Sequence, residues 1–158
     1  MKFKHHILIG IIGSILISYL FDLTYIEGLI IFSSSILIDI DHYFWYMNET
    51  KTINPFKAIK WYINHQKYSI WKKLSKEEKS KYKRGFYAFH GIEFWLILIL
   101  FSFWNITLLF ILIGIMLHIV PDVSYLIWKE ESPLQKISQI YVLKRNKNKR
   151  SLVNLWKE

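Results

Sequence analysis

The sequence predicts an all-α integral membrane protein built as a bundle of four transmembrane helices. Hydrophobic residues make up 53% of the 158-residue chain and aromatic residues 18%, and the apolar residues are clustered in runs long enough for membrane helices. The long loop at 42–87 and the chain after residue 128 are polar and strongly basic. The chain contains no cysteine, so disulfides and thiolate metal sites are excluded and any metal must be held by His, Asp or Glu.

The four expected spans follow the apolar runs in order. They cover residues 5–21, 26–41, 89–104 and 106–120. Gly10, Gly13 and Ser14 give the first span a face of small residues on which another helix can approach closely. Asn105 is the one clear break between the last two spans, which should therefore form a tight hairpin.

Interfacial amphipathic helices are expected in the 42–87 loop and after residue 132. Asn54 and Pro55 predict a helix start, and Phe56 and Ile59 begin an apolar stripe behind them. Ser75 followed by Glu78 predicts a capping box for a second short helix. The expected division is a membrane domain over 1–128, including a cytoplasmic loop at 43–87, and a basic amphipathic tail over 129–158.

The distribution of charge predicts the orientation. All 21 Lys and Arg residues lie in the N-terminus, the long loop and the tail, which four antiparallel spans place on one side. The positive-inside rule makes that side cytoplasmic, so the protein is expected in the cell membrane with both termini in the cytoplasm. The net charge of +9 predicts attraction to anionic lipid headgroups or a phosphorylated substrate, with nucleic acid a less economical partner.

Nine candidate metal ligands reach the same predicted cytoplasmic boundary, because each lies at the end of a span. They are His5, His6, Asp39, Asp41, His42, His90, Glu93, His118 and Asp122. His118 and Asp122 are spaced i, i+4, and the pairs His90–Glu93 and Asp39–His42 are spaced i, i+3, so each pair shares a helix face. Asp41 needs a frayed helix end to join them, and Pro121 could open the fourth helix for this purpose.

Imidazole and carboxylate ligands from facing helices are typical of metal centres in bundles. This donor set favours zinc, with Mn and Fe as alternatives, and two or more ions are expected. For His5 and His6, contact with lipid headgroups is as good an interpretation as metal binding, although at least one should bind. Carboxylates at a helix C-terminus oppose the helix dipole, so Asp39 and Asp41 are unlikely helix caps.

These motifs resemble those of the YdjM-type membrane-bound metal-dependent hydrolase family. The resemblance rests on Asp39-x-Asp41-His42, on Arg84-Gly85 followed by His90, and on Gly114-x-x-x-His118-x-x-x-Asp122, and it covers most of residues 5–125. That family is distantly similar to zinc-dependent phospholipase C and P1 nuclease. The resemblance implies phosphoester hydrolysis. Two departures are that Ile38 replaces the usual Pro and Lys83 the usual first His of the middle motif.

The sequence thus predicts an enzyme, a phospholipase-like phosphoesterase that uses a metal-activated water. Asp41 or Glu93 is expected as a further ligand or general base, and Arg84, with Lys83, as a contact to phosphate oxygens. One alternative is a metal-binding scaffold protein without catalysis, which a closed coordination sphere would favour. A small ion transporter is a weaker alternative, because the predicted spans carry no ionisable residue at mid-membrane.

Overall fold

The computed structural model describes residues 3–68 and 74–151, and these form two compact units. Unit 1 comprises residues 1–39 and 88–139, and unit 2 comprises residues 40–87 and 140–158. The predicted all-α class is confirmed for the described residues, which form helices and one isolated bridge between Tyr82 and Arg150. The chain from residue 140 groups with the long loop, and the expected boundary at residue 128 stays a prediction.

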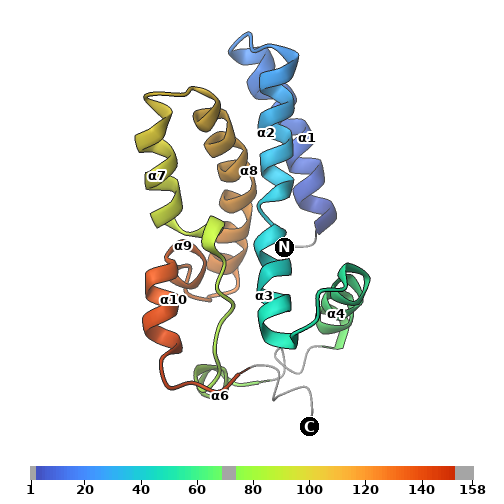
Figure 1. The fold of residues 1–158 in the computed structure, drawn as a ribbon, viewed down its shortest axis with the longest axis vertical. Coiled ribbons are helices and arrows are strands. Elements are labelled where there is room, and N and C mark those ends of the chain that lie inside the picture. The colour runs from blue at the N-terminus through green and yellow to red at the C-terminus, as the bar shows by residue number, and fades with distance from the viewer. Residues whose placement is uncertain (1–2, 69–73, 152–158) are drawn as a thin grey trace. The chain divides into compact units, whose positions relative to one another are not determined.

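Unit 1 is built from two helical hairpins (Figure 1). The helices are α1 (Phe3–Leu20), α2 (Tyr25–Leu37), α7 (Ile92–Ser102) and α8 (Thr107–Trp128), with a 3₁₀ turn at Ala88–His90 and the short α9 (Leu134–Ile137). A capping box starts α2: the Thr24 hydroxyl accepts from the Glu27 amide, and the Glu27 carboxylate accepts from the Thr24 amide at 2.7 Å. The α1–α2 and α7–α8 connections lie at the same end of the unit, so the other four helix ends lie at the opposite end (Figure 1).

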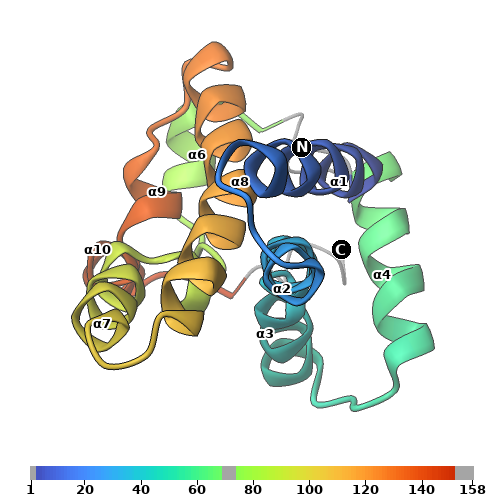
Figure 2. The same cartoon turned by 90° about the horizontal axis from the view of Figure 1, so that it is seen from above.

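Helix α8 lies between α7 on one side and α1 and α2 on the other (Figure 2). The apolar core of unit 1 lies along the sides of α8. Its buried members are Ile38, Leu98, Leu112, Ile115 and Ile119. Because these side chains come from three segments far apart in sequence, their burial holds the two hairpins together.

Small residues set the close approach of α2 to its neighbours. A side chain at Gly114 of α8 would collide with the main-chain oxygen of Ile31 and the hydroxyl of Ser34, and one at Gly10 of α1 would collide with the Ser35 hydroxyl. Ser34 and Ser35 satisfy their hydroxyls within α2, donating to the carbonyls of Ile30 at 2.8 Å and of Phe32 at 2.7 Å. The helices can therefore pack with their backbones nearly in contact.

Helix lengths do not support four complete spans. Among the described helices, α8 alone is long and apolar enough to cross a membrane, while the apolar stretches Lys4–Leu20 and Ile92–Ser102 are shorter. The 11 residues of α7 rise about 16 Å against a hydrocarbon core of about 30 Å. The second expected span stops at Leu37, whereas the fourth continues past Val120 to Trp128.

Unit 2 contains α3 (Ile40–Thr50), α4 (Pro55–Tyr68), α6 (Lys76–Ser80) and most of α10 (Gln139–Asn146). Aromatic rings fill the space between α3 and α4: the Trp61 ring lies 5.5 Å from those of both Trp45 and Tyr46, and the Tyr87 ring 6.2 Å from that of Trp45. Helix α3 was not predicted. Its aromatic residues form a packed cluster with Trp61 of α4.

Two of the expected local signals in unit 2 are confirmed. The Asn54 side chain accepts from the Lys57 amide at 3.1 Å at the start of α4, and Ser75 and Glu78 form the capping box of α6. The face of α4 that packs inward carries Ala58, which is buried, whereas Phe56 is 80% exposed. The predicted apolar stripe of α4 is thus its outer face.

The C-terminal segment is fixed to the loop before Tyr87. Asn146 accepts from the Arg84 amide and donates to the Arg84 carbonyl, both at 2.8 Å. The Arg145 guanidinium donates to the carbonyls of Tyr82 at 3.0 Å and Lys79 at 3.3 Å. This Arg145–Asn146 clamp gives the basic tail a structural role, and contact of the tail with lipid stays a prediction.

Candidate metal site

Five of the predicted ligands converge at the open end of the two hairpins in unit 1. They are His6 of α1, Asp39 after α2, His90 of the 3₁₀ turn, and His118 and Asp122 of α8. All are buried except Asp39, which is partly exposed. They form two overlapping triads, His6–His118–Asp122 and Asp39–His90–His118, in which the ligand atoms lie within 4.8 Å of one another.

His118 belongs to both triads, and its surroundings fix the state of its ring. Its Nδ1 lies 2.9 Å from the carbonyl oxygen of Ser35. Because a carbonyl only accepts, Nδ1 carries the proton, and a neutral ring then presents a lone pair at Nε2. A histidine that donates its other nitrogen to a backbone carbonyl is the usual arrangement for a metal ligand.

The His118 Nε2 atom faces two carboxylates without a hydrogen bond to either. It lies 3.4 Å from Asp39 Oδ1 and 3.7 Å from Asp122 Oδ2, and it is buried with no hydrogen-bond partner among the described residues. In the neutral ring, this places lone pairs of nitrogen and oxygen opposite one another in a dry environment, which is unfavourable. A cation between them would satisfy all three atoms at once.

The separations fit a small divalent ion. Two ligands at about 2.0–2.1 Å on a tetrahedral ion lie roughly 3.3–3.4 Å apart, which is longer than a hydrogen bond. The His118 Nε2–Asp39 Oδ1 separation is 3.4 Å, and His90 Nε2 lies 3.8 Å from the same oxygen. Asp39, His90 and His118 thus supply one oxygen and two nitrogens, a donor set that suits zinc.

Asp122 is already paired on both oxygens. His6 Nε2 lies 3.1 Å from Oδ1, and Lys136 Nζ of α9 lies 3.0 Å from Oδ2. The His6 ring also stacks on the His118 ring, with centroids 3.9 Å apart and planes at 11°. His6 and Lys136 therefore hold Asp122 beside His118, and His6 forms one wall of the site.

The two triads of unit 1 share His118, so they provide for one ion at that histidine. Both triads depend on His118, whose Nδ1 is engaged with Ser35 and whose Nε2 has a single lone pair. An ion at the Asp39–His90–His118 triad therefore excludes a second one at the other triad through the same atom. Within the described part of unit 1, Asp122 and His6 are then outer partners.

Two other predicted residues of unit 1 lie outside both triads. His5 is exposed, while His6 points inward. The Glu93 carboxylate accepts from the Ser138 hydroxyl at 2.7 Å and from the Gln139 amide at 3.1 Å, so it ties α7 to the start of α10. It belongs to neither triad of unit 1, and it does not share a helix face with His90, because His90 ends a 3₁₀ turn whereas Glu93 lies in α7.

Asp41, His42 and Arg84 belong to unit 2. Asp41 is buried in the first turn of α3, and the His42 ring packs against Tyr87 with centroids 4.0 Å apart. Asp39 lies between α2 and α3, so it is not on one continuous helix with His42, as had been expected. Arg84 is held through its main chain by Asn146.

Helix α8 does not end where the spacing suggested. It continues through Pro121 to Trp128, so His118 and Asp122 lie within the candidate membrane-spanning helix instead of closing it. Gly114, His118 and Asp122 follow one another at intervals of four and share a face. The glycine lets that face approach α2, which brings the His118 ring to the Ser35 carbonyl.

Two contributors to the site were not predicted. Lys136 was grouped with the amphipathic tail, and only its position in the structure reveals that its ammonium binds Asp122. The carbonyl of Ser35 is a main-chain group, so side-chain chemistry could not indicate it. The turn after α2, which brings Asp39 close to His118, has no strong signal in the sequence either.

The site defines a class, a helical protein with a buried His/Asp cluster that can hold a metal ion. Comparison with protein-family models, with characterised proteins and with solved structures found no match to this chain. The functional conclusion therefore rests on the geometry of the cluster itself.

Proposed function

We propose that this protein is a membrane-bound, metal-dependent hydrolase that cleaves a phosphoester. The observation that carries the proposal is the trio Asp39 Oδ1, His90 Nε2 and His118 Nε2, with separations of 3.4 and 3.8 Å and the His118 ring oriented by a carbonyl. Three protein ligands leave one tetrahedral position open, as in catalytic zinc sites. The resemblance to YdjM-type hydrolases supports the same reaction.

Each residue of unit 1 has a defined task in this proposal. Asp39, His90 and His118 would bind the ion, which would supply Lewis acidity for activating water and polarising the phosphoester. Asp122 lies 3.7 Å from His118 Nε2 and would accept a proton from the attacking water. Lys136, on Asp122, offers donors to a phosphate oxygen. Asp41 and Arg84 of unit 2 remain proposed as a general base and a phosphate contact.

The membrane location is part of the proposal. Helix α8 meets the length and hydropathy of a span, and large apolar side chains are exposed on the neighbouring helices. Examples are Leu8, Ile12 and Ile15 on α1 and Leu96 and Leu100 on α7. Such a continuous exposed apolar surface fits lipid, and we propose that all four long helices of unit 1 are embedded with both termini on the cytoplasmic side.

Two other functions remain candidates, and each has a distinct signature. A scaffold protein would bind zinc tightly and release no product. Ion transport gains support from one observation, that His118 and Asp122 lie inside the candidate span rather than at its end. A transporter would move ions across a sealed vesicle and would not hydrolyse phosphoesters.

The proposal is tested by phosphate release in detergent. The full chain, stripped of metal and reloaded with zinc, is assayed against a panel of phosphomonoesters and phospholipids. We expect release that depends on zinc and is abolished by Asp39→Asn. Asp22→Asn is the matched control, because Asp22 is an exposed acid at the opposite end of the first hairpin with a positive φ that asparagine tolerates. Zinc binding with no turnover of any substrate would favour the scaffold.

A further inference from the structure

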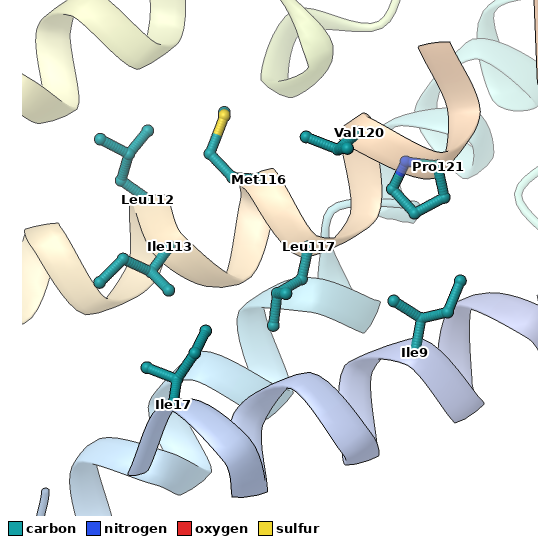
Figure 3. Close-up of a pocket in the computed structure, with 8 residues that line it drawn as sticks. All are labelled: Ile9, Ile17, Leu112, Ile113, Met116, Leu117, Val120 and Pro121. Atoms are coloured by element: carbon teal, nitrogen blue, oxygen red, sulfur yellow. The ribbon is translucent and has the colours of Figure 1, made fainter. Parts of the chain in front are cut away.

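A second feature of unit 1 is an apolar groove between α1 and α8 (Figure 3). Its volume is about 400 Å³. On α8 it is lined by Ile113, Leu117 and Pro121, which follow one another at intervals of four, and on α1 by Ile9 and Ile17. The two stripes face each other, so the groove runs along both helices for about 12 Å, the rise of eight residues.

A glycine opens the middle of this groove. Gly13 lies between Ile9 and Ile17 on the same face of α1, and a Cβ at this position would come within 2.7 Å of a methyl group of Leu117. The Leu117 side chain therefore packs against the backbone of α1 at Gly13. Figure 3 shows this side chain pointing toward α1. A larger residue would displace Leu117 into the groove.

One end of the groove meets the candidate metal site. Pro121 is followed directly by Asp122, and His6 lies one helical turn before Ile9 on α1. The polar groups at this end include the Lys136 ammonium at 3.0 Å from Asp122. An apolar groove whose last residue, Pro121, precedes Asp122 and its Lys136 ammonium has the chemistry to hold a lipid with an acyl chain and an anionic headgroup.

We propose that the groove holds an acyl chain of a phosphorylated lipid whose headgroup lies at the His/Asp site. This deepens the proposed function and rests on it, since it makes the substrate a membrane lipid rather than a soluble phosphoester. An acyl chain gains little free energy when it moves from the bilayer into the groove, because lipid tails are as apolar as the groove walls. The headgroup must therefore hold the lipid in place, and the groove determines where the chain lies.

The test maps where the chain lies. The full protein in nanodiscs receives a phosphatidate with a photoreactive group in its acyl chain, and labelled residues are identified by mass spectrometry. We expect labelling of Leu117 and Ile17 several-fold above that of the exposed Ile12 and Ile15 on α1. Excess unlabelled phosphatidate should remove the groove labelling, whereas diacylglycerol, which lacks the phosphate, should not.

A matched pair of variants separates the groove from the rest of the helix surface. Ile17→Trp fills the groove and should reduce labelling of Leu117 at least about threefold, whereas Leu16→Trp, on the exposed face of the same helix, should leave it unchanged. Even labelling of all apolar faces, or equal competition by diacylglycerol, would overturn the proposal. Groove labelling without phosphate release would leave the acyl site standing and reject the hydrolase.

Discussion

Unit 1 and unit 2 both contain a cluster of polar side chains, but they satisfy these groups differently. In the Arg145–Asn146 clamp of unit 2, donors meet main-chain carbonyls and an acceptor meets an amide, at 2.8–3.3 Å. At His118 of unit 1, a lone pair faces two carboxylate oxygens at 3.4 and 3.7 Å. Donor–acceptor pairs stabilise a fold on their own, whereas opposed acceptors need a cation. The structural cluster and the candidate site therefore differ in whether donors face acceptors, and not in how polar they are.

Removing a ligand from unit 1 should have the largest effect. Asp39→Asn takes away the charged oxygen that faces both His90 and His118. We expect zinc affinity to fall by more than the roughly 10–100-fold that loss of an outer partner causes. Isothermal titration in detergent measures it.

The matched control is Glu93→Gln, another acid-to-amide change in the same unit. Glu93 accepts from Ser138 and Gln139, so this variant should lose stability and keep its zinc affinity within about threefold. If Glu93→Gln removed zinc as completely as Asp39→Asn, the chosen triad would be wrong.

The close contact between α8 and α2 offers a second comparison. Gly114→Ala forces a side chain against the Ile31 carbonyl, which is backbone and cannot move aside. We expect about 1–3 kcal/mol of destabilisation from overpacking, together with weaker zinc binding because the His118 ring loses its Ser35 partner. Thermal unfolding with and without zinc measures both effects.

Gly28→Ala provides the control for that substitution. Its new methyl group would meet only the Ser18 hydroxyl, a side chain that can rotate away. The gain in helix propensity, up to about 1 kcal/mol, should offset the contact. A loss of stability as large as that of Gly114→Ala would mean that backbone contact is not the cause.

In unit 2, Asn146→Asp should weaken the Arg145–Asn146 clamp and leave zinc binding by unit 1 unchanged. The carboxylate still accepts from the Arg84 amide but no longer donates to the Arg84 carbonyl, which should cost about 1 kcal/mol. Faster hydrogen exchange at the Arg84 amide would report this loss. Lys147→Ala, an exposed neighbour, should leave exchange unchanged, and zinc content should be equal in both variants.

The smallest expected effect concerns the capping box of α6. Hydrogen bonds from the Ser75 amide and hydroxyl lower the pKa of Glu78 below its usual 4.5. Because the folded-state pKa is lowered, the cap's contribution is present above pH 4.5 and is lost as pH falls through the folded value. The protection factor of the Glu78 amide, which corrects for the slower intrinsic exchange in acid, should fall on acidification by less than about tenfold in the protein, and by less again in Ser75→Ala.

Much of unit 1 could be predicted from sequence because local signals agreed with the fold. Apolar runs and short turns predicted the hairpins, and the topology then placed His6, His90 and His118 at one end. The helix break after Leu37 could not be read, since Ile38 to His42 continues an uninterrupted helical pattern. Burial of the aromatic residues of α3 against α4 overrides that pattern.

The candidate site was predicted as a collection of ligands but not as a geometry. Spacing shows which side chains share a helix face, and it suggested that Glu93 joins His90. The structure pairs Glu93 with Ser138, 45 residues away in sequence, through a contact that no periodicity encodes. Lys136 reaches Asp122 for the same reason, since tertiary packing of α9 determines it.

The most direct test of the account is the zinc content of the purified full chain. After dialysis against zinc and removal of the excess, metal analysis should find one ion per chain in the wild type and in His5→Ala, whose side chain is exposed. It should find none in His118→Ala. Equal zinc in all three proteins would contradict the account, because no cation would then be needed where His118 faces Asp39 and Asp122.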